Sequence, residues 1–183
     1  MISSADRQLL SKIHTWKHNA VVDEDTLLTL KSLSFEKVVD VGCGDGFYGK
    51  LIKGLRDNVF VIGIEKNPIY KDKFELENFY DILLILDIRD TIKDIFADLI
   101  IFGDVLEHLE KVDCMNVLKV AVKHSKYILI NSPLGFQLQD HEYKEEWHRC
   151  GLEKEDFKAF NLISYKEYVE RGAMFSCLIK GDI

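Results

Sequence analysis

Residues 38–46, Val-Val-Asp-Val-Gly-Cys-Gly-Asp-Gly, combine an apolar run, an acid and three closely spaced glycines. This pattern is typical of a strand that turns directly into a helix, where Gly42 and Gly44 permit positive φ angles and let a ligand approach the backbone closely. Asp40, just before the turn, can accept a hydrogen bond from a cationic or amino group. The segment therefore predicts a nucleotide-type cofactor site, and a purely structural tight turn is the alternative.

The spacing of the glycines argues against a nicotinamide dinucleotide. Sites of that kind need the pattern Gly-x-Gly-x-x-Gly after a strand. Here the third position of the pattern is Phe47, and Gly46 falls one residue early. Dehydrogenase activity is therefore the weakest of the enzymatic interpretations.

Two further acids follow apolar runs at the spacing expected of the next two strands. Glu65 ends the second run, and an acid there suits a ribose because one carboxylate can accept from both hydroxyl groups. Asp87 ends the third run. With Ile88 beside it, this acid could accept from an adenine amino group while the apolar side chain contacts the ring. Since the carboxyl ends of parallel strands meet at one edge of a sheet, these positions predict one shared site.

The elements that would position these residues alternate along the chain. Short β-rich apolar runs are separated by amphipathic stretches, which is the pattern of parallel strands joined by right-handed crossover helices. Seven strands are expected near 37–42, 59–64, 82–86, 99–103, 127–131, 162–165 and 173–179, and crossover helices near 47–55, 67–74, 90–96 and 112–124. The expected fold class is therefore α/β, a doubly wound sheet with helices on both faces.

The two ends of the chain depart from this alternation. Only a short link containing Arg171 and Gly172 divides the last two runs, so the terminal strand is expected to return antiparallel to its predecessor. Before the first strand, two amphipathic helices are expected as a packed cap on the sheet, with substrate contact as the alternative. Their apolar residues are Leu9, Leu10, Ile13, Trp16, Leu27, Leu28, Leu30 and Leu33. Residues 1–183 are expected to form a single domain whose helical cap covers about 1–34.

Composition bounds the kind of protein. The 183 residues are 47% hydrophobic and 30% charged, with a formal net charge of −7. These values are typical of a globular protein and argue against broad attraction to nucleic acid. The apolar stretches are too short to span a membrane and residues 1–10 lack the features of a signal peptide, so cytoplasmic residence is expected. The four cysteines form no Cys-x-x-Cys pair, which favours reduced thiols over a zinc site or a disulfide framework.

Taken together, the motifs resemble those of the class I S-adenosylmethionine-dependent methyltransferases, in particular the type 11 and type 12 members. The first motif of that family reads here Val-Asp-Val-Gly-Cys-Gly-Asp-Gly at 39–46. The segment at 102–109, Phe-Gly-Asp-Val-Leu-Glu-His-Leu, is similar to the family's common Val-Leu-Glu-His-Leu segment. The resemblance covers nearly the whole chain. It implies a three-layer fold with the strand order 3-2-1-4-5-7-6 and strand seven antiparallel.

The resemblance also implies a cofactor and the residues that hold it. S-adenosyl-L-methionine is the expected cofactor. Glu65 would bind its ribose, Asp87 and Ile88 its adenine, and the glycine turn would face its methionine part. The full expected cofactor site is Asp40, Gly42, Cys43, Gly44, Glu65, Lys66, Asp87, Ile88 and Asp104.

The methyl acceptor is less constrained. Segments at 132–137 and 146–157 resemble methyltransferases of glycan biosynthesis, which favours an oxygen or nitrogen acceptor on a small-molecule or glycan-linked substrate. Methyl transfer from a sulfonium depends mainly on positioning, but a protonated acceptor also needs a base. His108 is the first candidate, because an imidazole titrates near neutrality. His141 and His148, in the loop after the fifth strand, come next. The alternative for His108 is a buried histidine bonded to backbone.

The segment from Asp104 to His108 has a second interpretation. A Glu-x-x-Glu-His pattern binds a divalent metal in some methyltransferases of ubiquinone synthesis and of small-RNA ends, and here the first Glu is Asp104. Carboxylates and an imidazole on one segment could ligate magnesium or zinc. Because the same Leu-Glu-His string is frequent in relatives without a metal, no metal ligands are expected. Asp104 is assigned to the cofactor, or to the cap of the following helix.

Two other functions stay open from the sequence. One is a partner subunit that binds the cofactor without chemistry, and the other is a methyltransferase of RNA or another nucleic acid. Base-modifying enzymes usually carry a Pro-Pro-Tyr type motif after the fourth strand, and 131–133 resembles it only superficially and follows the fifth. A nucleic-acid partner and a membrane span are therefore not expected, and the sequence indicates no oligomeric state.

Overall fold

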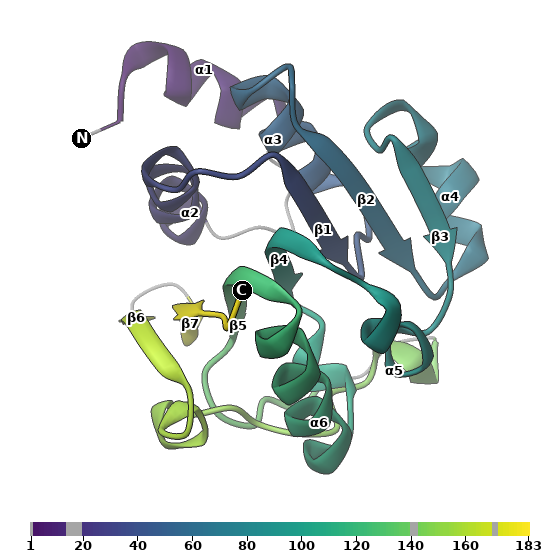
Figure 1. The fold of residues 1–183 in the computed structure, drawn as a ribbon, viewed down its shortest axis with the longest axis vertical. Helices are drawn as coiled ribbons and strands as arrows, with labels where there is room; N and C mark the ends of the chain where they lie inside the picture. Colours follow the sequence, from purple (N-terminus) through teal and green to yellow (C-terminus); the bar gives the residue numbers. More distant parts are fainter. Residues whose placement is uncertain (1, 14–19, 140–142, 170–171) are drawn as a thin grey trace.

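A seven-stranded sheet forms the centre of the molecule (Figure 1). The computed structural model describes residues 2–13, 20–139, 143–169 and 172–183. The strand order is β3-β2-β1-β4-β5-β7-β6. The strands are β1 (Lys37–Val41), β2 (Phe60–Glu65), β3 (Ile82–Ile85), β4 (Ala97–Gly103), β5 (Ser125–Pro133), β6 (Asn161–Tyr168) and β7 (Met174–Lys180).

Strand directions match the sequence-based expectation. The first five strands pair in parallel, whereas β7 is antiparallel to both β5 and β6. The antiparallel pairing follows from the short link between β6 and β7, which leaves no room for a crossover helix. The predicted fold class and strand order are confirmed.

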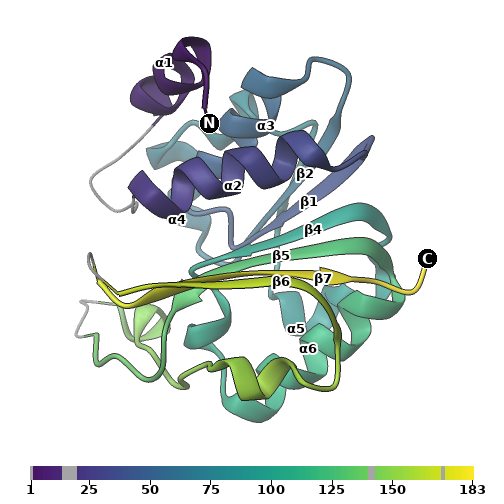
Figure 2. The same cartoon turned by 90° about the vertical axis from the view of Figure 1, so that its left-hand side faces the viewer.

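Helices cover both faces of the sheet (Figure 2). One layer holds α1 to α4, and the other holds α5 and α6. The α-helices are α1 (Ser4–Ile13), α2 (Ala20–Ser32), α3 (Phe47–Leu55), α4 (Pro68–Lys73), α5 (Ile88–Thr91) and α6 (Lys111–Lys123). Short 3-10 helices are η1 (Leu76–Asn78), η2 (Ile92–Asp94), η3 (Leu106–His108), η4 (Lys144–Glu146) and η5 (Lys154–Phe157). None of these described helices is long and apolar enough to cross a membrane.

Two apolar cores lie on the two faces of the sheet, because successive side chains of a strand point to opposite sides. In β1, the side chain of Val38 packs in the core under α1 to α3, and that of Val39 packs in the core under α5 and α6. In β4, Leu99 packs in the core under α1 to α3, and Ile100 packs in the core under α5 and α6. All four are fully buried. Each such burial contributes on the order of 1.5–3 kcal/mol, so the cores hold the strand ends in fixed positions.

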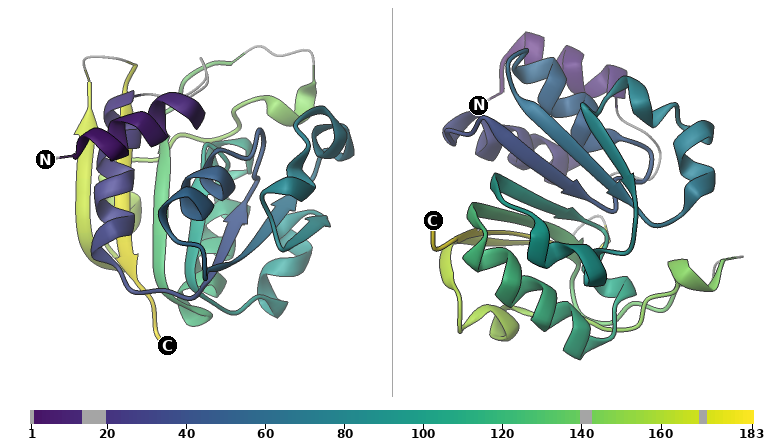
Figure 3. Two further views of the ribbon diagram at one scale, coloured as in Figure 1. Left: turned by 90° about the horizontal axis from the view of Figure 1, so that it is seen from above. Right: turned by 45° about the vertical axis from the view of Figure 1, so that its right-hand side comes forward.

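The first two helices pack against this scaffold, as Figure 3 shows. Leu10 of α1 and Leu27 and Leu30 of α2 are buried in the same core as Val38. The ammonium of Lys31 donates to the carboxylate of Asp6 at 2.9 Å, which joins the two helices. These contacts are packing contacts, as the sequence favours. Trp16, which belongs to the expected first helix, lies outside the described residues.

One crossover differs from the expectation. A helix over 90–96 was expected, but α5 begins at Ile88 and passes into η2 at Ile92. The earlier start has a local cause, since the side chain of Asp87 caps the helix by accepting from the backbone N–H of Arg89 at 3.0 Å. The turn after β3 is thereby fixed close to the strand end.

Candidate functional site

A cavity of about 1130 Å³ opens at the carboxyl ends of the parallel strands. It lies beside the point where the order reverses between β1 and β4, which is where open α/β sheets bind ligands. Cavities for drug-sized ligands hold roughly 300–1,000 Å³, so this one has room for a cofactor and a second molecule. Five strand ends contribute to its wall, through Gly42, Cys43, Gly44, Glu65, Lys66, Asp87, Ile88, Gly103, Asp104 and Pro133.

The glycine turn exposes its backbone to the cavity. Gly42 and Gly44 have φ angles of +63° and +50°, the left-handed region that favours glycine. A Cβ on Gly42 would lie 2.4 Å from the side chain of Val105. A Cβ on Gly44 would meet only the carbonyl oxygen of Gly42, at 3.7 Å. A side chain at Gly44 would therefore have little protein to meet and would fill space that a ligand can use.

Glu65 holds its carboxylate at the cavity wall and is 6% exposed. Oε2 accepts from the backbone N–H of Gly44 at 3.0 Å, and Oε1 accepts from that of Asn67 at 2.7 Å. Burial raises the pKa of this carboxyl. Each oxygen keeps a second acceptor position, so the carboxylate can still accept from two hydroxyl groups of a ligand.

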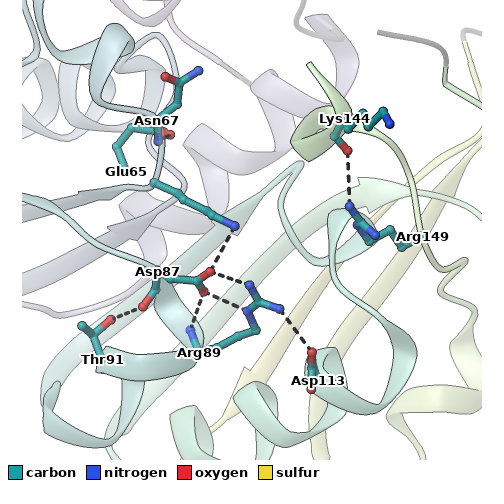
Figure 4. A network of polar contacts seen from close by, with 9 residues as sticks. Glu65, Asn67, Asp87, Arg89, Thr91, Asp113, Lys144 and Arg149 are labelled. Atoms are coloured by element: carbon teal, nitrogen blue, oxygen red, sulfur yellow. Dashed lines mark hydrogen bonds and ion pairs between the residues drawn. The ribbon is translucent and has the colours of Figure 1, made fainter. Parts of the chain in front are cut away.

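Asp87 also lies on the wall, but its acceptor positions are occupied (Figure 4). Oδ1 accepts from the backbone N–H and from Nε of Arg89, both at 3.0 Å. Oδ2 accepts from Nη2 of Arg89 at 2.6 Å and pairs with Nζ of Lys66 at 3.2 Å. The hydrogen bonds from Arg89 hold the pKa of Asp87 well below its usual range. An adenine amino group could reach this carboxylate only by displacing one of these four donors.

Asp40 does not reach the cavity. Its side chain is fully buried beneath the turn, and Oδ2 accepts from the hydroxyl of Tyr80 at 2.6 Å. Oδ1 has no hydrogen-bond partner among the described residues. Burial raises the pKa of Asp40 to about 7. The expectation that Asp40 itself accepts from the ligand is therefore corrected, because Asp40 supports the turn from below.

The other expected cofactor residues lie on the wall of the cavity. Cys43 is buried within the turn, and burial raises the pKa of its thiol. Ile88 follows Asp87 and is 6% exposed. Asp104 follows β4 with a φ of +52°, and its backbone N–H donates to the carbonyl oxygen of Asn131 at 2.9 Å. The structure thus gathers every expected cofactor residue except Asp40 around one space.

His108 lies on η3, at the other side of the cavity. Its Nδ1 lies 3.4 Å from the carbonyl oxygen of Trp147. Burial lowers the pKa of His108, so the neutral imidazole is favoured near pH 7. The expected candidate His141 lies outside the described residues, and nothing is assigned to it.

His148 reaches the same place from a distant segment. Its ring packs edge-on against that of His108, with centroids 5.1 Å apart. The backbone N–H groups of Arg149 and Cys150 donate to the carbonyl oxygen of Glu107 at 2.7 and 3.1 Å, which fixes the segment against η3. One ligand atom from each of Glu107, His108 and His148 lies within 4.8 Å of the others. The sequence analysis weighed Glu107 only as part of the Glu-x-x-Glu-His pattern and did not assign it to the site.

Asn131 has a structural position. Its amide donates to the hydroxyls of Thr26 and Tyr48, each at 2.8 Å, and it is 2% exposed. These bonds join α2 and α3 to the end of β5. This side chain is therefore committed to the interior.

The same fold occurs in several solved structures. NodS, an N-methyltransferase of Bradyrhizobium japonicum WM9 in complex with S-adenosyl-l-homocysteine, aligns with a TM-score of 0.69 and 16% identity over 99% of this chain and 100% of its own. TehB of Haemophilus influenzae aligns with a TM-score of 0.68 and 18% identity over 97% of this chain and 67% of its own. The N-terminal domain of EvdMO1, in the presence of S-adenosyl-l-homocysteine and D-fucose, aligns with a TM-score of 0.67 and 11% identity over 100% of this chain and 100% of its own.

Comparisons of the sequence alone find no match. No protein-family model matches the chain, and no curated protein matches it significantly. The structural likenesses combine low identity with coverage of nearly the whole chain and the same strand order. The protein therefore has the Rossmann-like fold of the class I S-adenosylmethionine-dependent methyltransferases.

Proposed function

We propose that the protein is an S-adenosylmethionine-dependent methyltransferase that methylates an oxygen or nitrogen of a small-molecule or glycan-linked substrate. The observation that carries the proposal is the shared cavity at the ends of β1, β2 and β3. There the carboxylate of Glu65 accepts from the amide of Gly44, which joins a ribose-binding acid to a backbone cradle. The fold and the ligand in NodS support the same cofactor.

The residues fit an adenosyl ligand at three points. Glu65 keeps acceptor positions for the ribose hydroxyls, Ile88 offers an apolar surface beside the adenine, and Gly44 leaves space for the methionine part. When bound, S-adenosylmethionine supplies a methyl group on a sulfonium, which is an activated leaving group. The task of the protein is then to orient the acceptor in line with that methyl. Positioning of this kind can lower a barrier by on the order of 7 kcal/mol.

The acceptor would enter from the side of η3 and the segment that carries His148. A hydroxyl acceptor must lose its proton as the new bond to carbon forms, and an ammonium acceptor must lose one beforehand, because its nitrogen has no free electron pair. The neutral imidazole of His108 is suited to take that proton on Nε2, because the carbonyl oxygen of Trp147 lies on the Nδ1 side. His148 has the same orientation toward the carbonyl oxygen of Gln137. Either ring is therefore a candidate base.

Calorimetry with S-adenosylhomocysteine tests the cofactor part of the proposal. The wild-type chain is expected to bind one molecule, and Gly44→Val to bind it far more weakly. Mass spectrometry after incubation with S-adenosylmethionine and pools of sugars, lipids, small RNAs and peptides then tests the activity. Absence of binding in the wild type removes the proposal. Binding without product in any pool favours the alternative of a partner subunit that holds the cofactor without chemistry.

A further inference from the structure

Glu107, His108 and His148 form a cluster on the acceptor side of the cavity. Glu107 and His108 are adjacent on η3, whereas His148 lies about forty residues later in the chain. Contacts between distant segments bring the three together. The nearest ligand atoms, one from each residue, all lie within 4.8 Å of one another. An ion placed between three such atoms would need only small side-chain movements to reach bonding distances of about 2.0–2.2 Å.

Glu107 has an acceptor with no partner. The residue is 1% exposed, and its Oε2 accepts from the hydroxyl of Ser132 at 3.0 Å. Its Oε1 is buried and has no hydrogen-bond partner among the described residues. A buried carboxylate oxygen without a donor costs free energy unless a proton or a cation satisfies it. This oxygen can therefore take up a proton or bind a cation.

The two histidines are oriented as ligands. A carbonyl oxygen can only accept, so the Nδ1 of His148, 2.7 Å from the carbonyl oxygen of Gln137, must carry the hydrogen. The Nδ1 of His108 faces the carbonyl oxygen of Trp147 in the same way, at 3.4 Å. A ring that donates from Nδ1 keeps a lone pair on Nε2. A ring N–H bonded to a backbone carbonyl is the usual support of a metal-bound histidine.

We propose that Glu107, His108 and His148 bind a divalent transition-metal ion of the Zn²⁺ or Co²⁺ type. Two imidazole nitrogens and one carboxylate oxygen suit such ions, whereas Mg²⁺ prefers ligand sets made of oxygen. Three protein ligands leave at least one coordination position open. All three residues line the same cavity as the glycine turn and Glu65.

The role of the ion in methyl transfer rests on the proposed function, whereas the metal site itself does not. An acceptor hydroxyl bound to the ion has a lowered pKa, so its proton leaves to water near neutral pH. The oxygen then forms a bond to the methyl carbon, and the carbon–sulfur bond breaks with its electron pair on sulfur. In this arrangement His108 is a ligand, and the base inferred from the sequence is not required.

Metal binding can be measured without an acceptor. The purified chain is treated with a chelator, dialysed, and titrated with ZnCl2, CoCl2 or MgCl2 in a calorimeter. One Zn²⁺ or Co²⁺ per chain is expected, with Mg²⁺ at least about 100-fold weaker. Loss of a residue that only supports a ligand weakens metal binding by roughly 10–100-fold, so His148→Ala should cost at least about 100-fold. Glu107→Gln, which keeps the size of the side chain, should do the same.

His124→Ala is the matched control, because His124 stacks on Phe96 at the end of α6, outside the cluster. It should leave Zn²⁺ affinity within about twofold of wild type. The proposal is overturned if the wild type binds neither Zn²⁺ nor Co²⁺, or if His148→Ala and Glu107→Gln, with wild-type circular dichroism, bind Zn²⁺ as the wild type does. Titration of the same variants with S-adenosylhomocysteine separates the two proposals, because cofactor binding should persist when metal binding is lost.

Discussion

The two sides of the cavity are built in different ways. The side proposed to hold the cofactor, called here the cofactor wall, consists of residues at the ends of β1, β2 and β3 or just after them, among them Gly42, Cys43, Gly44, Glu65, Lys66, Asp87 and Ile88. The acceptor wall consists of residues from η3, the end of β5 and the later segment, namely Glu107, His108, Pro133, Gln137, Tyr143 and His148. The first is fixed by the register of neighbouring strands, and the second by backbone contacts between segments far apart in the sequence. Cofactor binding and acceptor activation should therefore respond separately to substitution.

The acceptor wall also carries exposed aromatic surface. Tyr143 lines the cavity, is 40% exposed and belongs to a segment outside the strands of the sheet. Loops on a rigid scaffold commonly carry specificity, because they can change without disturbing the core. Under the proposed function, this wall is therefore the part of the cavity that we expect to select the acceptor.

Gly44→Val should cause the largest loss of affinity for the cofactor. The φ of +50° strains any side chain, and the open space at this Cβ means that valine would occupy the ligand's place. We expect affinity for S-adenosylhomocysteine to fall at least roughly 1,000-fold, about 4 kcal/mol. Zn²⁺ affinity should stay within about twofold of wild type. Calorimetry with each ligand measures both.

Gly135→Val controls for backbone strain, since Gly135 also has a positive φ and an open Cβ position, outside the cavity wall. It should lower the free energy of unfolding while leaving cofactor affinity unchanged. Equal losses of cofactor affinity in both variants would show that strain, and not occupation of the cavity, explains the effect.

Asp40→Asn tests the support beneath the cofactor wall. The folded-state pKa of Asp40, about 7, lies above the ordinary value of about 3.9 in an unfolded chain. Between about pH 4 and pH 7 the folded state keeps a proton that the unfolded state has lost, so this group lowers stability as pH rises. The asparagine side chain cannot ionise, and the variant should gain up to about 3 kcal/mol relative to wild type between pH 4.5 and pH 7.5.

Urea unfolding at the two pH values measures this difference. The exposed Asp182→Asn is the control and should follow the wild-type pH dependence. Parallel pH dependences of wild type and Asp40→Asn would mean that Asp40 is ionised in the folded protein.

The cofactor wall could be predicted from the sequence because its determinants are local. A strand that ends in an acid or a glycine turn places that residue at the sheet edge whatever the rest of the chain does. Gly44, Glu65 and Asp87 were found in this way. The sequence pattern does not show which other side chains contact these residues in the folded protein. Two such contacts are the hydrogen bond from the Tyr80 hydroxyl to Asp40 and the ion pair of the Lys66 ammonium with Asp87.

The acceptor wall could be predicted only in outline. The sequence singled out His108 and His148 one by one, but not their meeting with Glu107. That meeting depends on the path of 134–152, which is set by pairing of Leu134 and Gly135 with Leu152 and by the two bonds to the Glu107 carbonyl. Such contacts have no periodic signal along the chain, because they join segments of irregular structure.

Glu65→Gln tests the charge of the acid that we propose binds the ribose, with little change in shape. The amide oxygen can still accept from the backbone N–H of Gly44, but hydrogen bonds to a charged acceptor are stronger than those to a neutral one. We expect cofactor affinity to fall roughly tenfold, with Zn²⁺ affinity unchanged. The exposed Glu155→Gln provides the control. Unchanged binding in Glu65→Gln would exclude a charge-dependent contact with the ribose.

Lys66→Ala should change cofactor affinity the least, and it should raise the affinity instead of lowering it. The Lys66 side chain is 55% exposed and pairs with Asp87 at 3.2 Å, and exposed pairs of this kind contribute about 0.2–1 kcal/mol. Its removal frees one acceptor position on Asp87 for the adenine amino group. Affinity for S-adenosylhomocysteine should therefore rise up to about fivefold, most at low salt, because salt screens the competing pair. Lys71→Ala, which breaks a comparable pair with Glu77 outside the cavity wall, should leave affinity unchanged. A loss of affinity in Lys66→Ala would instead place the ammonium among the groups that hold the cofactor, as the sequence analysis assigned it.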